Sequence, residues 1–215
     1  MEAAGFVPTT RTYEALLTVV SRRRDVISAE KLWSVITANG DNMPKGLGAY
    51  TTMIAVYTGG IRRHLAEGGD AGPFTHNASL VWQQMIQHAG VPPDAHALNA
   101  YLALWAASRR LKRLQLVLGW FEEFHVARDK VTYNILSTLW SDMRHPVTCL
   151  ALREEMQANG VEPDAVTYRA WVTVAIRCAL RGREVEASGN IKPNPKHVRE
   201  RAMYLEQALN LLAEM

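Results

Sequence analysis

The sequence predicts an all-α fold, a right-handed α-solenoid of stacked helix-turn-helix repeats. Three observations carry this prediction: segments that recur at intervals near 35 residues, apolar residues that recur with helical spacing inside each repeat, and glycines where the second helix of a repeat should end. A helical hairpin of this size cannot cover its own apolar stripe. Neighbouring hairpins therefore have to stack, which buries one continuous core.

The repeat period is set by residues that share one phase. Leu98, Tyr133 and Tyr168 follow one another at intervals of 35 residues, and Tyr13 and Tyr50 are 37 residues apart. Each of these residues heads a similar segment. The interval between Tyr50 and Leu98 is 48 residues, which indicates an insertion in the second repeat.

The first helix of each repeat is predicted from large apolar residues at positions i, i+3, i+4 and i+7, which lie on one face of an α-helix. In the last repeat these residues are Tyr168, Trp171, Val172 and Ala175. In the repeat before it, Ser137 is a polar exception in the stripe.

The second helix of each repeat is predicted from a matching column of apolar residues: Ile36, Ile86, Phe121, Met156 and Met215. Gly40, Gly90 and Gly160 each follow this column by four residues, where a left-handed C-cap residue is expected. A Pro-Asp pair then precedes the next first helix at Asp94 and Asp164, as a helix start requires.

These signals divide the chain into repeats. The predicted boundaries are 1–10 for the end of a preceding repeat, then 11–47, 48–95, 96–130, 131–165 and 166–215. Insertions at about 59–77 and about 182–197 fall between the two helices of their repeats. We therefore expect residues near Gly69 and Pro193 to emerge on the same edge. Because the sequence starts and stops at one repeat phase, we expect a segment of a longer array.

The composition is that of an ordinary soluble protein, with 215 residues, 48% hydrophobic residues and 21% charged residues. No apolar run approaches the roughly 18 residues of a membrane span, so none is predicted. Cys149 and Cys178 each stand alone in an apolar helical pattern, which favours buried thiols over a disulfide or a zinc site. The net charge of +3 permits an anionic partner without requiring one.

Motifs for catalysis are missing from the sequence. The seven histidines are dispersed, and the glycine-rich stretch near Gly69 lacks the Gly-Lys-Ser/Thr of a phosphate-binding loop. We therefore predict that the protein is not an enzyme and that it carries no cofactor or metal. The first residues also lack the features of a secretory signal or of a transit peptide.

The repeats resemble one known family. The 35-residue period, the Val-Thr-Tyr-Asn of residues 131–134 and the Glu-Met-Gln-Ala-Asn-Gly-Val-Glu-Pro-Asp of residues 155–164 are similar to pentatricopeptide repeats. The resemblance covers nearly the whole chain outside the insertions. A tetratricopeptide array fits less well, because its 34-residue unit and its Leu-Gly signature are not seen.

The resemblance implies an RNA-binding solenoid that acts in organellar RNA metabolism. First helices would line a concave groove in which each repeat contacts one nucleotide of single-stranded RNA. It also implies a location in a mitochondrion or plastid. Two positions per repeat would select the base, which gives three pairs in this sequence: Thr51 with Asp94, Asn99 with Asp129, and Asn134 with Asp164.

By the pairing pattern of the family, these pairs resemble selectors for G, U and U. A short amide or hydroxyl group can meet the edge of an unstacked base, and a nearby carboxylate can orient it. The alternative is helix capping alone, because Asn and Asp are favoured at helix starts for that reason.

Two further sets of contacts follow from the resemblance or from charge. The residue that opens each repeat would pack on base faces, which assigns His96, Val131 and Val166; the fourth repeat alone would hold its base between two valines. Arg22, Arg109 and Arg177 occur near the predicted ends of first helices. They could contact phosphate oxygens, or they could simply suit the helix dipole.

Two classes of function stay open. One is an RNA-recognition module; the other is a structural subunit that holds ribosomal RNA or other subunits in a large ribonucleoprotein such as the mitochondrial ribosome. Base contacts contribute roughly 1 to 3 kcal/mol each, so three sites give at best about micromolar affinity once ordering is included. Degenerate first and fifth repeats favour the scaffold, whereas the intact Asn/Thr and Asp pairs favour recognition.

Overall fold

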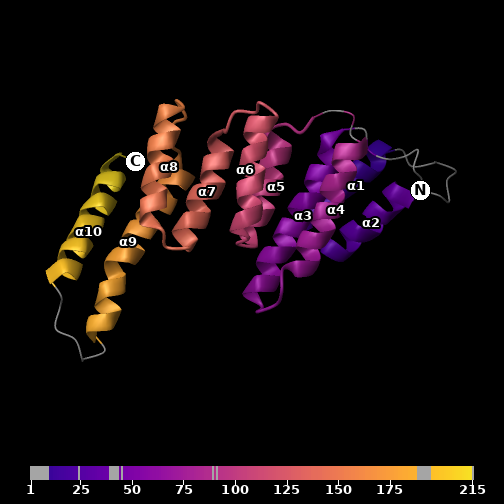
Figure 1. Ribbon diagram of the computed structural model, residues 1–215. Coiled ribbons are helices and arrows are strands. Elements are labelled where there is room, and N and C mark those ends of the chain that lie inside the picture. The colour runs from indigo at the N-terminus through magenta and orange to yellow at the C-terminus, as the bar shows by residue number, and fades with distance from the viewer. Residues whose placement is uncertain are drawn as a thin grey trace. The chain divides into compact units, whose positions relative to one another are not determined.

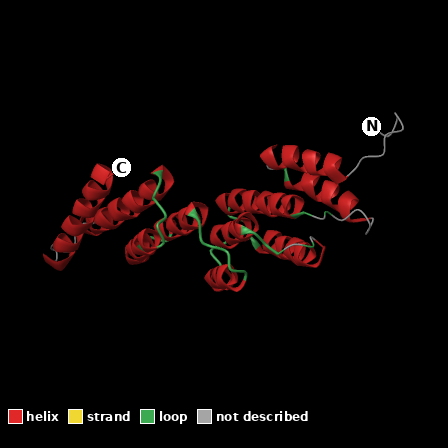
Figure 2. Cartoon of the chain, turned by 90° about the horizontal axis from the view of Figure 1, so that it is seen from above, coloured by secondary structure: helices red, strands yellow, loops and turns green. Residues whose placement is uncertain are grey.

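The computed structural model describes residues 10–23, 25–38, 44, 46–88, 90, 92–187 and 195–214. Within these ranges all regular secondary structure is α-helical (Figure 2). The helices form two compact units, Met1–Ala127 and Arg128–Met215. The predicted all-α fold of stacked helix-turn-helix repeats is confirmed.

The first unit consists of three helical hairpins (Figure 1). Its helices are α1 (Thr10–Arg23), α2 (Val26–Ala38), α3 (Leu47–Ala66), α4 (Gly72–His88), α5 (Ala95–Ala107) and α6 (Leu111–Glu123). Helix α3 packs against both α1 and α5, and each odd-numbered helix packs against the even-numbered helix that follows it. The predicted stripe of α3 forms the core, since Tyr50, Met53 and Ile54 have no exposed surface.

The second unit consists of two helical hairpins. Its helices are α7 (Lys130–Asp142), α8 (Pro146–Ala158), α9 (Ala165–Ala187) and α10 (Pro195–Glu214), and α9 packs against the other three. Tyr133 and Trp171 are buried as the stripe predicts. The polar exception Ser137 is also buried, because its hydroxyl oxygen accepts a hydrogen bond of 3.2 Å from the indole Nε1 of Trp171.

The helix starts predicted from aspartates are confirmed. Asp94 precedes α5 and accepts a hydrogen bond of 2.8 Å from the amide of Ala97. Asp164 precedes α9 and accepts a hydrogen bond of 3.0 Å from the amide of Thr167. Asp129 likewise precedes α7 and forms a capping box with Thr132. Each carboxylate thereby satisfies an amide that has no partner inside the first turn of its helix.

Helix ends follow two patterns. Gly90 and Gly160 adopt the left-handed conformation predicted for them, with φ of +69° and +67°, whereas Gly40 lies outside the described residues. Helices α5, α6 and α7 end in the same conformation without glycine, at Arg109, His125 and Arg144 (φ +54°, +54° and +58°). This conformation costs roughly 1–2 kcal/mol for a residue with a side chain, and the sequence pattern does not predict it.

The predicted apolar column of the second helices is correct at three of its five positions. Ile36, Phe121 and Met156 are buried, and Met215 lies outside the described residues. The prediction that Ile86 belongs to the buried column is wrong, because half of its surface is exposed and Met85 is buried in its place. The face of α4 that meets the core is thus shifted by one residue.

The first predicted insertion, residues 59–77, is mostly helical. It lengthens α3 to Ala66 and starts α4 at Gly72, which leaves a short turn around Gly69. Gly60 lies so close to Phe74 of α4 and Val26 of α2 that an added Cβ would be 3.0 Å from a carbon of each. These inserted residues therefore extend the packed hairpin as well as adding an exposed turn.

The second predicted insertion, residues 182–197, is described only in part. Residues 182–187 continue α9 and residues 195–197 begin α10, whereas Pro193 lies outside the described residues. Residues 1–10 are predicted to be the end of a preceding repeat, and residues 1–9 of this segment also lie outside the described residues. The repeat boundaries and the shared edge of the two insertions stay predictions.

Candidate nucleic-acid interface

The predicted pair of the fourth repeat is brought together inside the second unit. Asn134 is the fifth residue of α7, one turn from its start, and Asp164 immediately precedes α9, which packs against α7. The side-chain nitrogen of Asn134 donates a hydrogen bond of 3.0 Å to Oδ2 of Asp164. The carboxylate therefore orients the amide, as the sequence chemistry predicts.

A third residue, Thr167, completes this cluster, although no sequence pattern marked it as a site residue. The hydroxyl of Thr167 donates to Oδ1 of Asn134 at 2.6 Å, and the backbone amide of Thr167 donates to Oδ1 of Asp164 at 3.0 Å. Thr167 has no exposed surface. The signal that could have found it is the Asp-x-x-Thr spacing, which is typical of a capping arrangement at a helix start.

The charge of Asp164 is set by its hydrogen bonds. Burial works against the charged form, but the Thr167 amide, the Asn134 side chain and the Thr167 hydroxyl outweigh it. Together they hold the pKa of Asp164 below its ordinary value. The carboxylate is thus ionised at neutral pH and accepts hydrogen bonds only, which fixes the nitrogen of the Asn134 amide toward it.

Two exposed valines stand beside this cluster. Val131 lies in the first turn of α7 with 53% of its surface exposed, and Val166 lies in the first turn of α9 with 38% exposed. Large apolar residues with this much exposure can cover the face of a planar ligand. We call Val131, Asn134, Asp164, Val166 and Thr167 the Asn134 site.

A second polar network stabilises the N-terminal part of α7. The hydroxyl of Tyr133 donates to Glu155 at 3.2 Å and accepts from Asn159 at 2.8 Å. Glu155 also pairs with Arg128 at 2.7 Å. Because Tyr133 is the residue before Asn134 and has no exposed surface, these bonds anchor the turn that carries the Asn134 side chain.

The pair of the second repeat is not joined in this way. The Thr51 hydroxyl donates to the Gly48 carbonyl at 2.9 Å, and only 2% of Thr51 is exposed. Asp94 is exposed and caps α5 through Ala97. Among the described residues no hydrogen bond joins Thr51 to Asp94, and the roles predicted for these two residues stay predictions.

The pair of the third repeat takes one residue from each unit. Asn99 lies in α5 of the first unit and is 5% exposed, next to the exposed His96. Asp129 belongs to the second unit, where it caps α7. The roles predicted for Asn99, Asp129 and His96 stay predictions.

The three predicted phosphate contacts differ in their surroundings. Arg22 is exposed in the last turn of α1, and Arg109 is exposed directly after α5. Arg177 was expected near a helix end. This position is wrong, because α9 continues to Ala187. Its guanidinium lies 3.5 Å from Oδ1 of Asp142, so a carboxylate competes for it.

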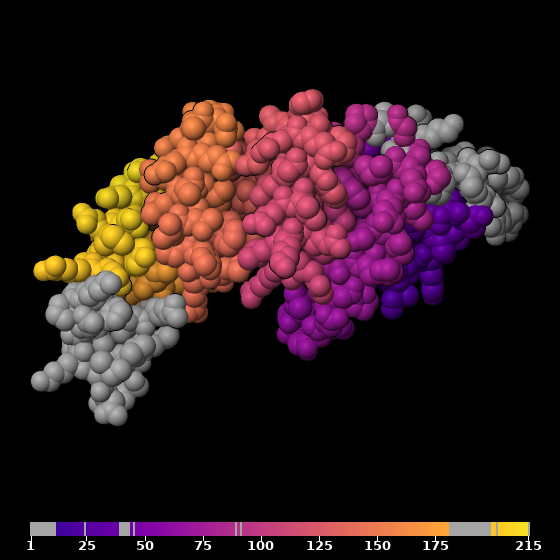
Figure 3. Space-filling model, in the orientation of Figure 1, coloured from indigo at the N-terminus to yellow at the C-terminus, as the bar shows by residue number. Residues whose placement is uncertain are grey.

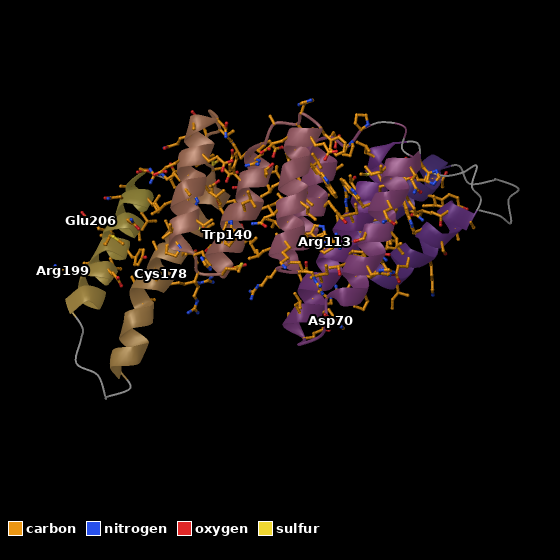
Figure 4. All side chains as sticks on the ribbon, in the orientation of Figure 1. Asp70, Arg113, Trp140, Cys178, Arg199 and Glu206 are labelled. Atoms are coloured by element: carbon orange, nitrogen blue, oxygen red, sulfur yellow. The ribbon has the colours of Figure 1, made fainter. Side chains whose placement is uncertain are left out.

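Arg109 belongs to a cluster of cations that we call the basic turn: Arg109, Arg110, Lys112 and Arg113. All four are exposed, and the sequence contains no acidic residue between Asp94 and Glu122. In the described part of the chain none of Arg109, Arg110 and Lys112 forms an ion pair. Arg113 of α6 (Figure 4) lies over the ring of Trp105 at 5.9 Å.

Aromatic rings fill the interior next to the basic turn. Trp82 stacks on Tyr101 with ring centroids 4.4 Å apart, and on Trp120 with centroids 5.4 Å apart. We call these three residues the aromatic stack. The aromatic stack takes one ring from each of α4, α5 and α6 in the first unit. Figure 3 shows one outer face of the molecule, with these helices in the purple to pink part of the colour scale.

The described residues also bear on three other features: the two cysteines, membrane-spanning helices and metal sites. Cys149 is buried, and burial raises the pKa of its thiol to about 12, whereas Cys178 on α9 (Figure 4) is half-buried. Within the described ranges no helix has the length and apolar character needed to cross a membrane. The same ranges contain no group of three or more side chains suited to hold a metal ion.

Stacked helical hairpins with a polar cluster at the start of a first helix define the chain as a helical-repeat protein. No family model matches the sequence. A chloroplastic pentatricopeptide repeat-containing protein of Oryza sativa subsp. japonica, the ATP4 homolog, is 29% identical over 99 residues. The match covers 46% of this chain and 15% of that relative.

Solved structures give the same result for the fold. The pentatricopeptide repeat protein PPR10 in complex with an 18-nt psaJ RNA element has a TM-score of 0.66 at 23% identity, over 96% of this chain and 29% of that one. The PPR domain of Arabidopsis thaliana protein-only RNase P 1 in complex with tRNA has a TM-score of 0.59 at 15% identity, over 93% and 91%. The chain therefore has the pentatricopeptide-repeat fold, and the predicted resemblance to these repeats is confirmed.

Proposed function

We propose that the chain is an RNA-binding module of the pentatricopeptide-repeat type that selects one nucleotide at the Asn134 site. The observation that carries the proposal is the hydrogen bond of 3.0 Å between Asn134 and Asp164. It links two residues that lie 30 positions apart in the sequence and at the starts of two neighbouring first helices. Capping alone does not require this bond.

The chemistry of the site fits a nucleobase. An amide has two N–H donors and two acceptor lone pairs, of which Asp164 and Thr167 use one each. One donor and one acceptor of Asn134 therefore remain for a ligand. The uracil edge offers a carbonyl acceptor beside an N–H donor, and Val131 and Val166 supply apolar surface for the two faces of the ring.

The basic turn supports a second contact, to the phosphate backbone. Its cations are exposed, close in sequence and free of nearby carboxylates in the sequence, so their charge is not neutralised locally. Arginine also forms paired hydrogen bonds with phosphate oxygens. Of the three predicted contacts, Arg109 is therefore the strongest candidate, followed by Arg22, whereas Arg177 faces Asp142.

The relatives favour the module over the scaffold. Both of the solved structures described above are complexes with RNA. The curated relative is named as chloroplastic, which supports an organellar location without distinguishing plastid from mitochondrion.

The proposal is tested by titrating the full-length protein against a random pool of single-stranded 20-nucleotide RNA, with duplex RNA and single-stranded DNA as controls. We expect preferential binding to single-stranded RNA that weakens with salt. Replacing Arg109, Arg110 and Lys112 by Ala should lower affinity for all sequences alike and reduce the salt slope by about 0.7 per lost contact. Equal binding of all three nucleic acids, or none, would refute the proposal.

A further inference from the structure

We infer that Thr167 is a positioning residue whose hydroxyl fixes the orientation of the Asn134 amide and so sets base selection at the Asn134 site. The inference rests on the proposed function, because it assigns the specificity of that same site. It concerns a residue that lies in the helix of the following repeat and has no exposed surface. Thr167 therefore acts through Asn134, without touching the nucleotide.

The geometry shows the Asn134 amide held at both ends. Its oxygen accepts from the Thr167 hydroxyl at 2.6 Å, which is at the short end of the range for such bonds, and its nitrogen donates to Asp164 at 3.0 Å. Both partners belong to the start of α9, whereas Asn134 belongs to α7. The amide thus bridges two helices in one fixed plane.

The direction of the Thr167 hydroxyl is itself set by the backbone. Its oxygen lies 3.2 Å from the backbone amide of Asp164, which donates to it. A hydroxyl has one proton, and two acceptors lie near it: the Asn134 oxygen at 2.6 Å and Oδ1 of Asp164 at 3.1 Å. The contact with Asn134 is the shorter of the two, which favours it as the main bond. Since Thr167 is fully buried, water does not compete for this bond.

The chain contains a natural comparison that separates this role from capping. In α5 the equivalent position is Ala97, and Asp94 still caps that helix by accepting from the Ala97 amide at 2.8 Å. A cap at this position therefore needs no hydroxyl. In the repeat before it, Thr51 bonds to its own helix at Gly48, and no hydrogen bond joins Thr51 to Asp94 among the described residues.

The orientation of the amide matters most for telling uracil from cytosine. Uracil has a carbonyl on each side of its N3–H, so it can pair with either orientation of an amide. Cytosine has an amino donor on one side of an N3 acceptor, so it pairs with one orientation only. An amide held at both ends can therefore reject cytosine, whereas an amide held by Asp164 alone is less strictly oriented and discriminates less between the two bases.

The test compares Thr167→Val, which removes the hydroxyl at nearly constant shape, with Thr167→Ser, which keeps it. Each full-length variant is used to select from a random single-stranded RNA pool, and the bound sequences are counted base by base. We expect Thr167→Val to raise cytosine relative to uracil about fivefold at a single position, as the loss of one hydrogen bond implies. Thr167→Ser should restore the ratio found with the original protein.

The possible outcomes are distinct. If the original protein selects a base at that position and the ratio does not change in Thr167→Val, Thr167 does not position Asn134, while the proposed function stands. If the original protein binds no RNA, the proposed function fails and this inference with it. If Thr167→Val does not fold by circular dichroism, Thr167→Ala carries the same test, since Ala97 shows that alanine fits the equivalent place in α5.

Discussion

The second and fourth repeats place the same two sequence positions in contrasting environments. In the fourth repeat, Asn134 reaches across to Asp164 and Thr167 and leaves part of its amide for a ligand. In the second repeat, Thr51 is 2% exposed and turns back to Gly48. The repeat register thus decides where a side chain lies, whereas the residue types around it decide whether a polar site forms.

The interiors of the two units also differ: aromatic packing dominates beside the second repeat, and hydrogen bonds dominate beside the fourth. The first unit holds the aromatic stack, in which dispersion and area burial dominate. The second unit holds the hydrogen-bond network of Tyr133 and the buried bond between Trp171 and Ser137. Flat apolar surfaces give stability with little directional demand, whereas hydrogen bonds fix geometry.

The largest effect should come from removing the centre of the aromatic stack. Trp82 is 6% exposed, so Trp82→Ala should lower the stability of the first unit by about 3–5 kcal/mol, through lost burial and a cavity. Urea denaturation gives the size of the loss. Hydrogen exchange should show it in α4, α5 and α6 and leave α7 to α9 protected; uniform loss of protection would mean that the two units unfold as one.

A smaller effect tests the base-selecting pair directly. Asn134→Thr should move the preference at one nucleotide from U toward G by about 1 kcal/mol, as a single base contact implies. The matched control is Thr51→Asn in the second repeat, where the side chain is buried and already bonded. Selection from a random RNA pool measures both, and a larger change from Thr51→Asn would reverse the contrast drawn between the two repeats.

Helix ends offer a comparison within the second unit. Arg144 holds a φ of +58° after α7, so Arg144→Gly should stabilise the protein by about 0.5–1 kcal/mol through relief of backbone strain. Gly160 holds a φ of +67° after α8, so Gly160→Ala should destabilise it by a similar amount. Thermal unfolding compares the pair, and equal shifts of the same sign would be inconsistent with a backbone cause.

The smallest effect is a pH dependence. The pKa of Asp164 is lower in the folded protein than its ordinary value of 3.8. Its contribution to stability is therefore fully present above pH 3.8 and is lost as the pH falls through the lower folded value. Asp164→Asn should flatten this acid limb in urea titrations, and an acid limb that this substitution leaves unchanged would contradict the assignment to Asp164.

Much of the fold could be predicted because a repeat states the same pattern several times. The stripe of Tyr133 and Tyr168, the caps at Asp94 and Asp164, and the turns at Gly90 and Gly160 each follow from one local rule. Ile86 was placed wrongly because the insertion changes which face of α4 meets the core. A pattern that takes one apolar residue from each repeat does not detect a shift of one residue along the helix.

The candidate site could be predicted only in part. Asn134 and Asp164 are marked by residue type and phase, and their contact is present. Thr167 was missed because a threonine at a helix start is already explained by capping. The position of Arg177 was wrong because helix length across an insertion depends on packing, which extends α9 to Ala187.

The Asn134 site is composite, since its amide comes from one hairpin and both of its orienting groups from the next. Under the proposed function, a hairpin of this kind acquires its selectivity only after the next hairpin has docked. An array of such units therefore always contains one hairpin more than the number of bases it can distinguish. During synthesis on the ribosome, each position would become competent one step after its own helices have emerged.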